Sequence, residues 1–134
     1  MDRSGFTAVG AVLVVICGCH SAEQPTSLTA CAAPVTVAVQ SRVTPRFSWS
    51  PSCRLSRVIV DPDSDVVDVW VLASAGDTNG LRSPIDYGSS PNGSQTIVPA
   101  FVLQSGASYR VRVLLATGDT TTPFQIIGFA GFTP

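Results

Sequence analysis

Four of the nine acidic residues of the chain gather in one stretch. Asp61, Asp63 and Asp65 alternate in the order Asp-Pro-Asp-Ser-Asp, and Asp68 follows closely. Calcium takes roughly six to eight oxygen ligands, and carboxylates at alternate positions of a loop supply several of them. Asp and Pro are also ordinary turn formers. We therefore expect a solvated turn and no metal, with a calcium site at Asp61, Asp63 and Asp65 as the weaker alternative.

Residues that could serve nucleophilic catalysis are scarce. A Ser or Cys nucleophile needs a base to activate it, yet the chain has no Lys and its single His is His20, close to the N-terminus. The remaining carboxylates of the domain, Asp77, Asp86 and Asp119, stand mostly among turn-forming residues. We expect no enzymatic activity and no cofactor.

Two aromatic residues are candidates for a ligand surface. Trp70 and Tyr87 border the irregular region 74–94, which is rich in Gly, Pro and Asn. Binding residues are commonly carried on loops that a rigid scaffold positions, so the pair could stack on a carbohydrate. Aromatic residues in strands are more often core residues, and both interpretations stay open here.

The first 19 residues have the organisation of an export signal. A short segment with Arg3 precedes the apolar run Phe6–Ile16, and small residues follow. A basic start, an apolar run and small residues at the cut are typical of a secretory signal. The run is much shorter than the roughly 20 residues of a membrane-spanning helix. We therefore expect a cleaved signal.

The end of this signal resembles the lipobox of bacterial lipoproteins. Ile16, Cys17 and Gly18 fill the three positions before the obligatory cysteine, Cys19. The resemblance implies cleavage between Gly18 and Cys19 and acylation of Cys19, which becomes the first residue. Two or more acyl chains give stable anchoring where one does not. The alternative is an ordinary secretory signal.

The resemblance also implies a location. His20 follows the lipidated cysteine where an Asp tends to retain lipoproteins of didermal bacteria in the inner membrane, so the outer membrane is expected. The eight basic residues, all Arg, are scattered, and the net charge is −1. Without a basic stripe, we expect no nucleic-acid partner.

Two cysteines remain if Cys17 leaves with the signal and Cys19 is lipidated. In an oxidising exported compartment, the isolated pair Cys31 and Cys53 is expected to form a disulfide. The alternative, a zinc pair, lacks the further ligands that a site of about four donors needs.

Short alternating segments dominate the rest of the chain. Apolar residues at every second position predict strands, and Gly and Pro between them predict turns. About seven strands spaced in this way are typical of a single two-sheet β-sandwich. The expected strands are 35–39, 46–50, 55–60, 66–73, 108–116 and 124–132, with weaker ones at 83–87 and 95–103.

Two motifs resemble the fibronectin type III family. The segment 103–113 has a Leu, a turn with Gly106, and Tyr109 opening a strand of alternating Val; the segment 45–51 places Trp49 in a second strand. The resemblance implies that Tyr109 forms a tyrosine corner and that Trp49 is a core residue. The stretch 54–98 is longer and more irregular than the family's pattern, and a Cys31–Cys53 pair is not a family feature.

These observations predict three parts: a lipoprotein signal peptide over 1–18, a lipidated N-terminus and flexible tether over 19–33, and a fibronectin type III-like β-sandwich over 34–134. The expected function is a lipid-anchored cell-envelope lipoprotein with a non-catalytic binding or scaffolding domain. Its expected partners are the membrane, through the lipid, and a protein or glycan. The alternative function is a carbohydrate-binding or adhesion module exported to the cell surface.

Overall fold

The protein is described by a computed structural model that covers residues 29–32 and 34–134. The expected signal peptide, the cleavage site between Gly18 and Cys19, and the tether up to residue 28 lie outside the described residues.

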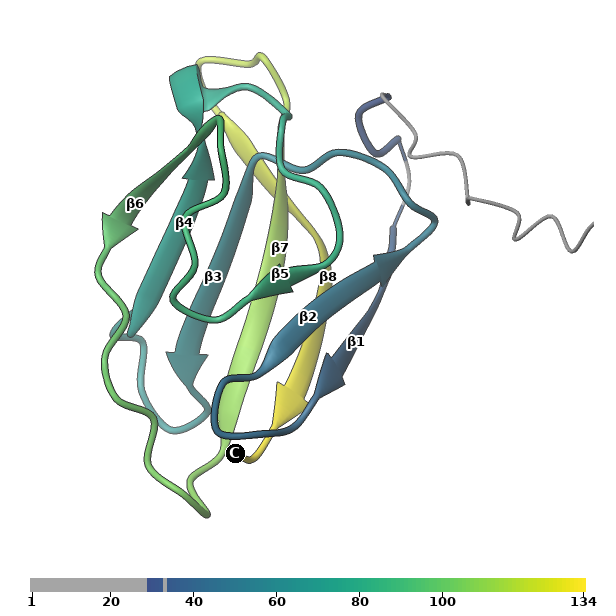
Figure 1. Ribbon diagram of the computed structural model, residues 1–134. Coiled ribbons are helices and arrows are strands. Elements are labelled where there is room, and N and C mark those ends of the chain that lie inside the picture. The colour runs from purple at the N-terminus through teal and green to yellow at the C-terminus, as the bar shows by residue number, and fades with distance from the viewer. Residues whose placement is uncertain (1–28, 33) are drawn as a thin grey trace, which may run out of the picture.

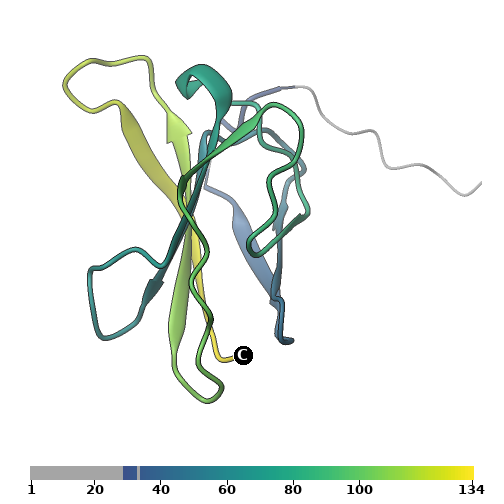
Figure 2. The same ribbon diagram turned by 60° about the vertical axis from the view of Figure 1, so that its left-hand side comes forward.

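The described chain folds into two antiparallel sheets that face each other (Figures 1 and 2). The smaller sheet has the order β1-β2-β5, with β1 Thr36–Gln40, β2 Arg46–Ser50 and β5 Ile85–Asp86. The larger has the order β6-β4-β3-β7-β8, and one 3-10 turn, Ala75–Asp77, follows β4. The predicted all-β sandwich is thus confirmed. The strands of the larger sheet are β3 Arg57–Pro62, β4 Trp70–Ser74, β6 Ser94–Val98, β7 Tyr109–Ala116 and β8 Phe124–Phe132.

The core lies between the two sheets and is built by the alternation seen in the sequence. Phe47 and Trp49 of β2 are buried against the larger sheet, because successive strand side chains point to opposite faces. The Phe47 ring lies 6.3 Å from Trp70 and 5.5 Å from Phe132, measured between ring centroids. The larger sheet contributes buried apolar residues from its inner strands: Val58, Val60, Leu72, Val111 and Val113.

The chain joins the two sheets just before β1. The Val35 N–H donates to the Ile127 carbonyl at 2.8 Å, so this segment lies against β8 before it continues into the smaller sheet. A Cβ atom on Gly128 would lie 2.7 Å from the Val35 carbonyl oxygen. Glycine is therefore required at this crossing.

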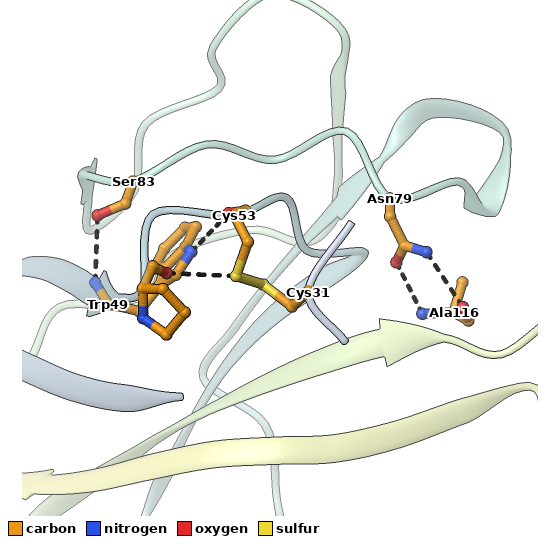
Figure 3. The surroundings of a disulfide bond; sticks show 7 residues. Cys31, Trp49, Cys53, Asn79, Ser83 and Ala116 are labelled. Atoms are coloured by element: carbon orange, nitrogen blue, oxygen red, sulfur yellow. Dashed lines mark hydrogen bonds between the residues drawn. A yellow bond between two sulfur atoms is a disulfide. The ribbon is translucent and has the colours of Figure 1, made fainter. Parts of the chain in front are cut away.

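The disulfide expected between Cys31 and Cys53 is present (Figure 3). Around it, the Cys31 N–H donates to the Arg54 carbonyl at 3.0 Å, and the Trp49 Nε1–H donates to the Cys53 carbonyl at 2.8 Å. The bond joins the first described residues to the connection between β2 and β3. It thereby fastens the point at which the chain enters the domain.

Asn79 fastens the loop after β4 at the same end of the sandwich (Figure 3). Its Oδ1 accepts from the Ala116 N–H at 2.8 Å, and its Nδ2 donates to the Ala116 carbonyl at 3.1 Å. The loop is thus bound to the last residue of β7.

The strand predicted over 66–73 is shorter than expected. Pairing between β3 and β4 begins at Val60 and Trp70, and the Val69 N–H donates to the Val60 carbonyl at 2.8 Å. Val66 and Val67 consequently belong to the connecting loop and are exposed. Conversely, β3 continues through Asp61 to Pro62, beyond the predicted end at Val60.

Candidate functional site

A groove lies at the end of the sandwich opposite to Thr29, the first described residue. There β3 ends and β7 begins, and the groove runs between the β3–β4 loop (63–69) and the segment 99–108, both low in Figure 1. It has a volume of about 780 Å³, which is within the range of small-ligand and peptide sites. We call it the distal groove.

Large apolar side chains around the distal groove are exposed to solvent. Val67 and Phe101 are each 61% exposed and Val102 is 94% exposed, and all three line the groove. Val66, 89% exposed, precedes Val67 on the β3–β4 loop but does not line the groove. A contiguous group of exposed apolar side chains is typical of interaction sites.

Hydrogen bonds hold one wall of the groove in place. The Phe101 N–H donates to the Val69 carbonyl at 3.0 Å, which joins the segment 99–102 to the chain just before β4. The Tyr87 hydroxyl donates to the Phe101 carbonyl at 2.7 Å and lies 3.3 Å from the Val69 carbonyl. Burial raises the pKa of Tyr87 to about 12, so the hydroxyl remains a donor at neutral pH.

The remainder of the same wall, residues 103–108, is held by a turn and by Tyr109. The Ala107 N–H donates to the Gln104 carbonyl at 3.2 Å, and Gly106 has a φ of 81°, a left-handed conformation that glycine adopts without strain. The Tyr109 hydroxyl accepts from the Gln104 N–H at 2.9 Å. The Asp63 N–H donates to the Ser108 carbonyl at 3.0 Å, so the two walls are joined.

A buried ionic cluster lies on the opposite face of the sheet from the core. The Asp61 carboxylate is fully buried and accepts from Arg110 at 2.7 Å and from Arg112 at 2.9 Å. Arg112 also contacts Asp68 at 3.1 Å. The hydrogen bond with the Asp61 carboxylate raises the pKa of Arg110.

The charge of the distal groove is negative. Within the described part of the chain, the charged residues that line it are Asp63 and Asp68, and no Arg lines it. Asp63 is exposed, and so is Asp65 on the same loop. Asp68 is paired with Arg112, and Arg110 is paired with Asp61, so the negative charge that faces solvent on this loop comes from Asp63 and Asp65.

The calcium alternative gains no support from the geometry. Asp61 belongs to β3 and both of its carboxylate oxygens face arginines, whereas Asp63 and Asp65 stand on the following loop. Among the described residues, no three carboxylate, His or Cys side chains come together as metal ligands.

The structure distinguishes the two interpretations that were open for Trp70 and Tyr87. Trp70 is fully buried, with its ring between Phe47 and Tyr87, so it belongs to the core and not to a surface. Tyr87 is partly exposed, but its hydroxyl is engaged by Phe101 and Val69. Tyr87 therefore positions a wall of the groove.

The apolar residues of the groove were not singled out from the sequence. Val67 lies in the predicted strand 66–73, and Phe101 and Val102 lie in the predicted edge strand 95–103. The only local signal is a turn-forming residue shortly before them, Asp65 in one case and Pro99 in the other.

Comparisons with known proteins identify no relative: no protein family, curated protein or solved structure matches the chain. Within residues 29–32 and 34–134, no helix has the length and apolar character required to cross a membrane.

Proposed function

We propose that this protein is a lipid-anchored lipoprotein of the bacterial cell envelope whose β-sandwich is a non-catalytic binding domain. The observation that carries the proposal is the arrangement of the two ends of the domain. The chain enters at Thr29, beside the disulfide, and the distal groove opens at the opposite end. Anchoring through the N-terminus therefore leaves the groove free.

The length of the connection to the anchor is compatible with this arrangement. Ten peptide steps separate Cys19 from Thr29, and a fully extended chain of that length spans about 35 Å at most. The domain is then held close to the bilayer by its N-terminal end. We place the protein in the outer membrane, with a protein as the partner.

We also propose that the sandwich is fibronectin type III-like. Support comes from the bond between Tyr109 and the Gln104 backbone, which has the form of a tyrosine corner, and from the burial of Trp49. Strand β6 follows β5 in the sequence and pairs with β4 at the edge of the larger sheet. We attribute the greater length of the stretch 54–98 to this strand.

Metabolic labelling with radioactive palmitate tests the anchor. We expect label in the wild type and in Cys17→Ser, because a small residue is sufficient at the position of Cys17. We expect none in Cys19→Ala. Equal incorporation by the wild type and Cys19→Ala would refute lipidation at Cys19.

A further inference from the structure

We propose that the distal groove binds an extended segment of a partner protein in which apolar side chains are flanked by Lys or Arg. This deepens the proposed function: it rests on the sandwich being a binding domain, and it is independent of the lipid anchor.

The apolar part of the partner follows from the exposed side chains. Val67, Phe101 and Val102 line the groove with more than half of their surface in contact with water. Covering apolar surface contributes about 25 cal/mol per Å², so an apolar side chain in the groove stabilises the complex. Because these side chains are exposed, they contribute little to the core. Their exposure favours a role in binding.

The extended form of the partner follows from the shape and the rigidity of the groove. Its walls are two lengths of chain, joined by the bonds from Phe101 to Val69 and from Asp63 to Ser108. The wall formed by 99–108 is held by two tyrosine hydroxyls: that of Tyr87 donates to the Phe101 carbonyl, and that of Tyr109 accepts from the Gln104 N–H. Little conformational entropy is lost when such a preformed groove binds a peptide.

The basic part of the partner follows from charge. The two charged residues that line the groove are both Asp; Asp68 is paired with Arg112, and Asp63 is exposed and carries the charge that a partner would meet. Complementary charge at the rim of an interface favours a cationic partner and excludes anionic ones. The same charge disfavours anionic lipid, because anionic membrane surfaces attract basic segments. The observations therefore favour a basic peptide over a membrane as the occupant.

The test uses a chain that begins at His20, which contains both sheets and the whole described core. Two synthetic peptides are titrated into it: Lys-Leu-Phe-Leu-Lys and its counterpart Glu-Leu-Phe-Leu-Glu, both with blocked ends. Backbone amide chemical shifts report the position of binding. We expect saturable shifts at Val67, Phe101 and Val102 with the Lys peptide and binding about tenfold weaker with the Glu peptide, a difference of about 1.4 kcal/mol.

Matched variants separate the apolar and the ionic contributions. Asp63→Asn should weaken binding of the Lys peptide about threefold, whereas Asp119→Asn, at the other end of the sandwich, should leave it unchanged. Val102→Ser should weaken both peptides. Val43→Ser is its control, because Val43 is 95% exposed but does not line the groove. The dispersion of the amide spectrum shows whether each variant is folded.

Three results would overturn the proposal: no shifts with either peptide, equal affinity for both, or shifts confined to residues outside the groove. Shifts at Phe101 and Val102 on vesicles of phosphatidylglycerol would assign the groove to lipid and also contradict it. Palmitate labelling is scored separately, so failure of the anchor and failure of the groove are distinguishable.

Discussion

The Asp61 carboxylate is buried on the face of β3 that points away from the core, between Arg110 and Arg112 of β7. Removing one partner of a buried ion pair leaves the other charges uncompensated. Asp61→Asn should therefore lower the free energy of unfolding by about 2–4 kcal/mol, measured by urea denaturation.

The control is Asp77→Asn, because Asp77 forms an ion pair with Arg57 but its side chain is 67% exposed. An exposed pair is worth at most about 1 kcal/mol. Equal losses in the two variants would show that burial of Asp61 contributes nothing.

Tyr87 is a second residue whose environment can be measured, through the pKa of its phenol. Burial raises its pKa from 10.0 to about 12. Because the folded protein holds the proton more tightly than the unfolded chain, this contribution to stability is complete below pH 10.0 and is lost as the pH rises through about 12. The ultraviolet absorbance of phenolate, titrated in the wild type and in Tyr87→Phe, should differ by one step centred near pH 12. A difference step centred at the ordinary tyrosine value would contradict the placement of this ring.

At the scale of elements, the disulfide fastens the entering chain to the β2–β3 connection. The bonded cysteines are 22 positions apart, and a closed loop of that length stabilises a fold by about 3 kcal/mol on the chain-entropy account. The double variant Cys31→Ser with Cys53→Ser should lose about that much in urea denaturation. Reduction of the wild type should give the same loss, and an unchanged midpoint after reduction would count against the bond's contribution.

The crossing of the chain before β1 over β8 depends on Gly128. An added Cβ would meet the Val35 carbonyl oxygen, which is backbone and cannot move aside without displacing β1. We expect Gly128→Ala to cost about 1–3 kcal/mol through overpacking. Gly131→Ala on the same strand is the control, because a Cβ added there would lie 3.9 Å from its nearest neighbour, the Tyr109 carbonyl oxygen. Calorimetry should show a lower melting temperature for the first variant only; equal shifts would mean that the close approach has no energetic consequence.

At the scale of the whole molecule, the alternation of apolar and polar residues predicted the strands whose two faces differ in side-chain character. The alternation of Val with Arg over 109–113 became β7, and 124–132 became β8 with the bounds expected. The Cys31–Cys53 pair was also predicted correctly. For the strands the signal lies in the residues of the element itself, and for the disulfide it lies in the small number of cysteines that could pair.

The sequence could not predict properties that depend on which strands become neighbours. The β-branched run 66–73 reads as one strand, but the hairpin closes at Val69, so its first residues form a wall of the groove. Asp61 was expected in a solvated turn and is buried, because pairing with β7 brings two arginines to it. The distal groove has parts from distant stretches of the chain, and no single stretch reveals it.

The central claim is that the domain is anchored through lipid on Cys19, and intact mass spectrometry of the protein extracted from bacterial membranes tests it most directly. We predict the mass of a chain that begins at Cys19, increased by a diacylglyceryl group and an amide-linked acyl chain, and reduced by the hydrogens lost in the Cys31–Cys53 bond. A chain that retains residues 1–18, or one without lipid mass, would contradict the claim.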